Sequence, residues 1–231
     1  MKISISLIIF LFTVTCSNGQ NQYSVTFNEG GDLAYFTVKD GDHNAVRVSH
    51  DGKVLEWGRE VPLPSSKGLK FKPRLQKDLP GVPIEFYGAE SDSINRGKLK
   101  KLGRMSFFYE PIFLPERGKL RSANTSIHYN TTSTDSVLNG KISSIGAYKV
   151  EFYSSSEEKI LRGRLKSIDS TVITYYSGSD EKFLQGRVKS IGSTTYTWRK
   201  SIEKGVTKVN LVNSDYRQYE RIWNFVLREG F

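Results

Sequence analysis

Residues 163–192 read GRLKSIDSTVITYYSGSDEKFLQGRVKSIG, and this stretch opens and closes on the same pattern. The pattern is a glycine, a cation, an aliphatic residue, a lysine, a serine and an isoleucine. The pattern starts once at Gly163 and again at Gly186. These two residues are the last of five glycines that recur every 21 to 23 residues: Gly97, Gly118, Gly140, Gly163 and Gly186. A fixed period of this length is typical of a repeat architecture.

Each repeat contains two strand-like segments. An apolar and aromatic segment, such as residues 173–176, precedes a polar turn, and the glycine-led segment follows. A short turn at Gly, Asp or Asn then leads to the next aromatic segment. Two strands per unit predict an all-β fold, with an antiparallel meander of 21–23-residue β-hairpin repeats over residues 84–213.

The spacing of apolar residues in the glycine-led segment predicts an irregular strand. Leu165 and Ile168 are three residues apart, whereas side chains on one side of a regular strand are two apart. We expect a β-bulge that lets both residues be buried. The repeat glycine would supply a positive φ or leave room for a neighbouring aromatic ring. The alternative is that one of the two apolar residues faces the far side of a two-faced sheet.

Two segments precede the repeats. Residues 20–60 alternate apolar and polar residues in short runs that are separated by turn formers such as Asp40-Gly41, which predicts an N-terminal β-meander. Residues 61–83 hold five of the seven prolines. Because proline cannot donate a hydrogen bond to a central strand, this segment is expected to be an irregular connector or a wrapped edge, and to mark a domain boundary.

The period changes in residues 214–231. Ser214 is a residue type that often caps a helix, and Tyr219, Ile222 and Val226 follow at helical spacing. The open edge of a repeat stack needs a cover. We therefore expect a C-terminal amphipathic capping helix, with a final strand as the alternative.

Residues 1–19 have the pattern of a signal peptide, with one cation at Lys2 and an apolar run that ends at Val14. The run is too short for a membrane span, so no transmembrane helix is expected in the mature chain. Two cleavage sites compete. Cys16, the only cysteine, stands where a bacterial lipoprotein carries its lipid, whereas Gly19 ends a sequence that suits ordinary signal peptidase. We expect an exported protein, either an outer-membrane lipoprotein anchored only through Cys16 or a secreted or periplasmic protein.

The repeat unit resembles the β-hairpin repeats of secreted and lipoprotein-type bacterial proteins. Its period and its tyrosine and glycine positions are similar to those of MORN-like repeats, and residues 186–198 (GRVKSIGSTTYTW) resemble the YD repeats of Rhs-type proteins. The chain departs from the YD pattern at Tyr176-Ser177, where that family has Tyr-Asp. The resemblance covers residues 84–200. It implies a hairpin architecture and brings no catalytic residue.

The positive charge of the chain is concentrated in the repeats. The whole chain has a formal net charge of +10, and residues 97–204 alone contain 19 Lys and Arg against 10 Asp and Glu. Many of these cations follow the repeat glycine by one or three residues. The candidate binding residues are Lys98, Lys100, Lys119, Arg121, Lys141, Arg164, Lys166, Arg187 and Lys189.

These cations predict a binding stripe, because residues two apart on a strand lie on the same side of a sheet. A stripe of this kind attracts polyanions such as acidic glycans, lipopolysaccharide and anionic lipids. The alternative is that the lysines and arginines are only the solvated half of amphipathic strands. We expect a non-enzymatic envelope or secreted module whose partner is an anionic glycan, a lipid surface or another envelope protein, with no cofactor.

Catalytic groups are sparse in the sequence. It contains neither a Gly-x-Ser-x-Gly elbow nor a phosphate-binding loop, and its three histidines lie in predicted loops, so no metal site is expected. Adjacent carboxylates occur in predicted turns at Glu157-Glu158 and Asp180-Glu181. Glycoside hydrolysis needs a pair of carboxyl groups, so a carbohydrate-active hydrolase is the alternative function.

Overall fold

The computed structural model describes residues 21–28, 30–61, 74–203, 206–212, 217–220 and 223–227. All regular elements in these ranges are β-strands, and their sheets are almost entirely antiparallel. The predicted all-β class is therefore confirmed. The expected signal peptide, with Cys16, lies outside the described residues.

The N-terminal strands form one seven-stranded sheet. Its strands are β1 (Gln22–Phe27), β2 (Leu33–Lys39), β3 (Asn44–Val48), β4 (Val54–Val61), β5 (Arg74–Gln76), β19 (Arg217–Glu220) and β20 (Trp223–Leu227). Their order across the sheet is β19-β20-β1-β2-β3-β4-β5. Strands β1 to β4 pair antiparallel in chain order, because alternating sequences joined by tight turns favour hairpins. Strand β20 pairs parallel to β1.

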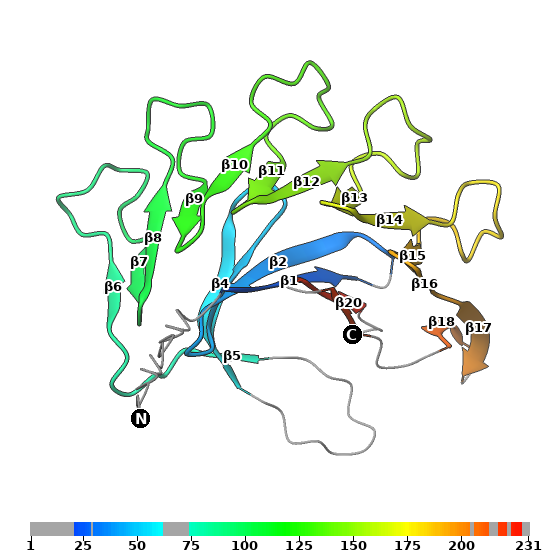
Figure 1. Cartoon of the computed structure of the whole chain (residues 1–231), viewed down its shortest axis with the longest axis horizontal. Helices are drawn as coiled ribbons and strands as arrows, with labels where there is room; N and C mark the ends of the chain where they lie inside the picture. The colour runs from blue at the N-terminus through cyan, green and yellow to red at the C-terminus, as the bar shows by residue number, and fades with distance from the viewer. Residues whose placement is uncertain are drawn as a thin grey trace, which may run out of the picture.

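The repeats form a meander of hairpins that curves around the N-terminal sheet (Figure 1). Its strands are β6 (Ile84–Phe86), β7 (Leu99–Leu102), β8 (Met105–Tyr109), β9 (Leu120–Ala123), β10 (Ile127–Tyr129), β11 (Ile142–Ile145), β12 (Tyr148–Phe152), β13 (Leu165–Ile168), β14 (Thr171–Tyr175), β15 (Val188–Ile191) and β16 (Thr194–Thr195). They pair in chain order from β6 to β9 and from β10 to β16. The long loops lie on the outer side of the curve (Figure 1). A hairpin of β17 (Trp198–Glu203) and β18 (Val206–Leu211) follows.

Each glycine-led strand contains the β-bulge that the sequence predicts. In the fourth repeat, strand β12 pairs with Leu165 and then with Ser167, so Lys166 is the extra residue. The same register shift occurs in the other four repeats. Because of the extra residue, Leu165 and Ile168 are both buried although they are three residues apart.

The repeat strands and the N-terminal sheet share one hydrophobic core. Alternate side chains along β1, β2 and β3 are buried in the same cluster as alternate side chains of the repeat strands. The fully buried large side chains include Phe27, Phe36, Phe107, Leu120, Ile145 and Leu165. Burial of a side chain of this size contributes about 1.5–3 kcal/mol, so the two layers stabilise each other.

Turns of the N-terminal sheet bind the backbone of the repeats directly. The N–H of Leu120 donates to the carbonyl oxygen of Gly52 at 2.9 Å, and the N–H of Ile142 donates to that of His50 at 2.8 Å. Gly52 has a φ of 86° and lies so close to the Tyr129 ring that a Cβ atom would overlap it. This turn therefore requires glycine and fixes the N-terminal sheet against the second and third repeats.

The structure does not show the capping helix predicted for residues 214–231. The described residues of this segment form the strands β19 and β20. Trp223, Phe225 and Leu227 alternate along β20, and aromatic residues favour strands. The edge of β1 offers a pairing partner to β20, and Phe225 is buried. The pairing of β20 with β1 therefore outweighs the helical spacing of the sequence, and the described residues of this segment form strands.

Candidate functional site

The nine candidate cations lie in two rows. The cation directly after each repeat glycine belongs to a set that we call the inter-repeat row: Lys98, Lys119, Lys141, Arg164 and Arg187. The cation two residues later belongs to the outer row: Lys100, Arg121, Lys166 and Lys189. The outer-row cation is the extra residue of the β-bulge. The sequence predicted the bulge, but it placed the cations in one stripe and not in two rows.

Each cation of the inter-repeat row lies over the aromatic ring that follows in the next unit of the meander. The charged group is 4.7 to 5.3 Å from the ring centroid. The pairs are Lys98–Tyr109, Lys119–Tyr129, Lys141–Phe152, Arg164–Tyr175 and Arg187–Trp198. Cation–π contacts of this kind contribute about 0.5–2 kcal/mol each, depending on desolvation. The row therefore connects successive units.

The same rings also bond back to the preceding unit. The Tyr109 hydroxyl donates to the Leu99 carbonyl at 3.0 Å, and the Tyr175 hydroxyl donates to the Leu165 carbonyl at 2.8 Å. Burial raises the pKa of both tyrosines well above the usual value near 10. They therefore remain neutral hydrogen-bond donors over the whole physiological range.

The repeat glycine leaves room for a cation of the preceding repeat. Lys98 Nζ donates to the carbonyl oxygen of Gly118 at 2.7 Å, and Lys119 Nζ donates to that of Gly140 at 2.7 Å. A Cβ atom at Gly118 would lie 2.6 Å from Lys98 Nζ. Both glycines have a φ of 76°. The predicted positive φ is confirmed, but the neighbour that needs the space is a cation and not an aromatic ring.

Arg164 joins the repeats to the N-terminal sheet as well. One of its guanidinium nitrogens, Nη1, is 3.0 Å from a carboxylate oxygen of Asp32 and donates to the Gly30 carbonyl at 2.9 Å. Its Nε donates to the Ile160 carbonyl at 2.7 Å, and the side chain is only 15% exposed. An external anion would have to displace these partners to reach Arg164.

Desolvation acts on the lysines of the inter-repeat row too. Burial lowers the pKa of Lys98, and the charge of Asp92 opposes this effect. Burial likewise lowers the pKa of Lys141, against the charge of Asp51. Partial removal from water and stacking on a ring both indicate that these lysines serve the fold.

The outer row is more accessible. Lys100, Arg121 and Lys189 are exposed, and among the described residues they form no ion pair. Lys189 Nζ lies 5.5 Å from the ring centroid of Tyr176. Lys166 is half-buried and lies 3.4 Å from Glu157. In the third repeat this position holds a serine, Ser143.

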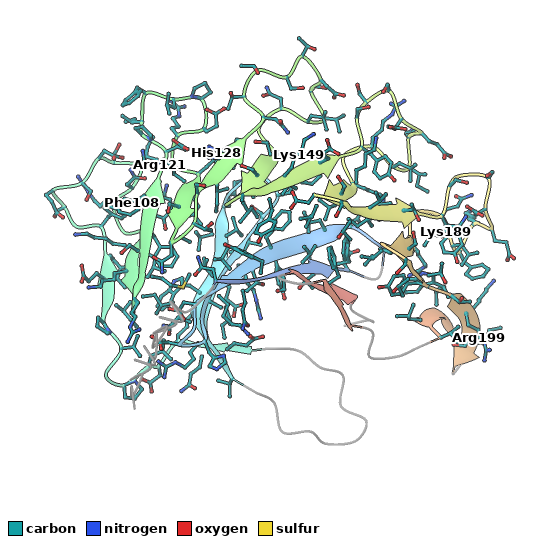
Figure 2. All side chains as sticks on the ribbon, viewed as in Figure 1. Phe108, Arg121, His128, Lys149, Lys189 and Arg199 are labelled. Atoms are coloured by element: carbon teal, nitrogen blue, oxygen red, sulfur yellow. The ribbon has the colours of Figure 1, made fainter. Side chains whose placement is uncertain are left out.

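Other side chains share this surface, which we call the outer face: the side of the repeat strands turned away from the N-terminal sheet. Figure 2 shows Phe108, Arg121, His128, Lys149, Lys189 and Arg199 along the outer side of the curve. Two further lysines of the outer face form ion pairs, Lys101 with Glu85 at 3.5 Å and Lys149 with Glu151 at 2.5 Å. Hydrogen bonds from Lys149 and Ser167 lower the pKa of Glu151.

The carboxylates considered for hydrolysis have partners in the turns. Glu158 accepts a hydrogen bond from the N–H of Gly178 at 2.6 Å, and Asp180 accepts one from the N–H of Ser177 at 2.6 Å. The first bond joins two successive loops, and the second lies within one turn. Within the ranges that the structure describes, no three His, Cys, Asp or Glu side chains converge in a way that could hold a metal ion.

Sequence reasoning missed the aromatic partners of the inter-repeat row. The signal is present, since an aromatic residue follows each of these cations by ten or eleven positions, as Tyr175 follows Arg164. In the described part of the chain no helix is long and apolar enough to cross a membrane. Comparisons of the chain with models of protein families, with curated proteins and with solved structures gave no match.

Proposed function

We propose that this protein is an exported, non-enzymatic β-repeat module that binds polyanions through its outer face. The residues that carry the proposal are the three exposed cations of the outer row, Lys100, Arg121 and Lys189. They recur at one position of the repeat and point away from the core. The inter-repeat row supports the proposal indirectly, because it holds the repeats in register and so fixes the spacing of the outer row.

The availability of these cations is the observation that favours binding. Lys101 and Lys149 have carboxylate partners within 3.5 Å, whereas the three outer-row cations have none among the described residues. Exposed ion pairs contribute only about 0–1 kcal/mol to stability. Exposed cations without a carboxylate partner retain their capacity to neutralise an external anion, and the anion releases counterions when they do so.

Export is part of the same proposal. It rests on the signal-like pattern of residues 1–19, with Cys16 as the point of lipid attachment in one form and free secretion in the other. The intact mass of the protein isolated from its source would distinguish the forms. A diacylglyceryl-modified Cys16 at the N-terminus supports the lipoprotein, an N-terminus near residue 20 supports the free form, and an unprocessed Met1 contradicts export.

Binding is tested with a matched pair of triple variants. The first replaces Lys100, Arg121 and Lys189 by serine, which the third repeat already carries as Ser143. The control replaces three exposed loop cations by serine and removes the same charge: Arg117, Lys159 and Lys182. Binding to heparin is measured by isothermal titration calorimetry at two salt concentrations.

The proposal predicts that only the outer-row variant loses affinity, by at least about tenfold, and that wild-type binding weakens as salt increases. Equal losses in both variants would indicate non-specific attraction by net charge. Binding that does not respond to salt, or no binding to heparin, anionic vesicles or DNA, would reject polyanion recognition.

A further inference from the structure

We infer that the ligand of the outer face is a linear acidic polysaccharide with one anionic group per disaccharide, lying across the strands along the curve of the repeats. The inference rests on the proposed polyanion binding and narrows it to one chemical class. Three properties of the outer face support it: the interval between cations, their low density, and the hydroxyl groups between them.

The interval between outer-row cations follows from the topology. Each repeat contributes two strands, and neighbouring strands lie about 4.8 Å apart, so equivalent residues of successive repeats are about 10 Å apart. This interval is close to the length of one disaccharide in an extended polysaccharide. A chain with one carboxylate per disaccharide therefore has the same spacing as the bulge positions of successive repeats, and it can meet the exposed cations of the first, second and fifth repeats.

The density of cations argues against nucleic acid. A nucleic acid strand carries one phosphate per about 3.4 Å, and its binding proteins neutralise many phosphates with closely spaced Lys and Arg. The outer row offers at most one cation per repeat, and Ser143 leaves the third repeat without one. Lys101 and Lys149 are already paired with carboxylates. A sparsely charged polymer matches this surface better than a densely charged one.

The residues between the cations suit a sugar. A half-buried serine stands next to the bulge residue in three repeats: Ser122, Ser144 and Ser190. In the fourth repeat the equivalent Ser167 is buried and donates to Glu151. Hydroxyl groups both donate and accept hydrogen bonds, as sugar hydroxyls do. Phe108, which is 48% exposed, pairs with Ser122 beside Arg121 and provides an apolar ring on which a sugar face can stack.

The inference is tested with a series of hyaluronan oligosaccharides, which carry one carboxylate per disaccharide. Affinity for the full chain is measured by competition for a labelled hyaluronan decamer. Because each added disaccharide reaches one more repeat, we expect affinity to rise with length up to about five disaccharides and then to level off. The Phe108→Ala variant should weaken binding several-fold without changing the salt dependence.

Competitors with other charge spacings distinguish binding of a sparsely charged polysaccharide from polyanion binding in general. Polygalacturonate, oligodeoxythymidylate and phosphatidylglycerol vesicles are compared with hyaluronan at equal charge concentration, and hyaluronan should compete best by at least about tenfold. If one of the others competes best and the outer-row variant loses that binding, the polysaccharide assignment is overturned and polyanion binding stands. If none competes or binds, both fail.

Discussion

The two rows of cations differ by two positions in the sequence and have opposite roles in the molecule. In the fourth repeat, Arg164 bonds to Asp32 and lies over Tyr175, and it is largely buried. In the fifth repeat, Lys189 lies in the other row and is exposed. Their positions in the repeat produce the difference: the inter-repeat cation comes one residue before the glycine-led strand, whereas the outer-row cation is the extra residue of the β-bulge within it.

This contrast shows that a regular charge pattern does not identify a binding face by itself. Both rows have the same period and the same residue types, and only their neighbours distinguish them. Each cation of the inter-repeat row has an aromatic ring as a partner in the next unit, and Lys98 and Lys119 also donate to a carbonyl oxygen of the next repeat. The outer row lacks such partners in the described structure except at Lys166 and Lys189.

Alkaline pH is expected to break the inter-repeat contacts most strongly. Burial raises the pKa of Tyr109, Tyr129 and Tyr175 in the folded protein. Their contribution is complete below pH 10 and is lost as pH rises above it, because the unfolded chain then releases protons that the folded chain retains. At pH 11 the loss is about 1 kcal/mol for each of these tyrosines.

Lys98 and Lys141 have the opposite effect on the pH dependence of stability, and they have it at lower pH. Their folded pKa values are lowered, so the unfolded chain binds more protons between the lowered value and 10.5, and stability rises with pH there. Urea unfolding measured at intervals between pH 8 and pH 11 should therefore show a decline only above about pH 10. Stability that is constant through pH 11 would mean that the tyrosines are not buried.

Arg164→Ser should be the most destabilising single substitution in the inter-repeat row. It removes the Asp32 ion pair, the bonds to the Gly30 and Ile160 carbonyls and the contact with Tyr175. We expect the free energy of unfolding to fall by about 3 kcal/mol. The control Lys189→Ser should change it by less than about 0.5 kcal/mol, as exposed substitutions usually do. Equal effects of the two substitutions would remove the distinction between the rows.

Tyr129→Phe isolates one hydrogen bond of the inter-repeat contacts. The hydroxyl donates to the buried carbonyl of Leu120, and the fourth repeat natively has Phe152 at the equivalent position, so the ring itself is tolerated. Loss of the bond should reduce the free energy of unfolding by about 1 kcal/mol. A neutral result in chemical denaturation would show that the carbonyl finds another partner.

Ser143→Lys tests whether a cation added at the bulge position increases binding, because it completes the outer row. The third repeat is the one unit without an outer-row cation. An added sulfate or carboxylate contact should tighten heparin binding by about threefold and make it more sensitive to salt. Ser136→Lys, at an exposed loop position of the same repeat, is the control for added charge. A similar gain in both variants would mean that position within the repeat is unimportant.

The sequence predicts the fold well where the pattern is local. The glycine period, the two strands per repeat and the spacing of Leu165 and Ile168 lead to the hairpins and the bulge that the structure shows. The C-terminal segment could not be predicted in the same way. Its pairing with β1 joins residues about two hundred positions apart, and nothing local in residues 214–231 indicates that partner.

The sequence predicts only part of the candidate site, because the rest again depends on contacts between residues far apart in the chain. The positions of all nine cations follow from the repeat, but their partners lie in neighbouring repeats or, for Arg164, in the N-terminal sheet at Asp32. Each inter-repeat cation comes just before its strand, so the alternation within the strand does not show that its charged group reaches an aromatic ring of the next repeat. In the sequence, only the aromatic residue ten or eleven positions after each cation of the inter-repeat row indicates its partner.

Competitive labelling of lysines with an amine-reactive reagent tests directly whether the inter-repeat row is protected and the outer row is accessible. Modification of each lysine in the native protein is followed by mass spectrometry, with Lys159 and Lys182 as exposed references. Burial lowers the pKa of Lys98 and Lys141, which alone would speed their reaction, so slow reaction can only reflect protection.

We expect the outer-row lysines, Lys100 and Lys189, to react as fast as the references. Lys98, Lys119 and Lys141 should react at least about fivefold more slowly, because their charged ends are stacked on aromatic rings and those of Lys98 and Lys119 are also hydrogen-bonded. Equal reaction rates in the two rows would contradict this expectation.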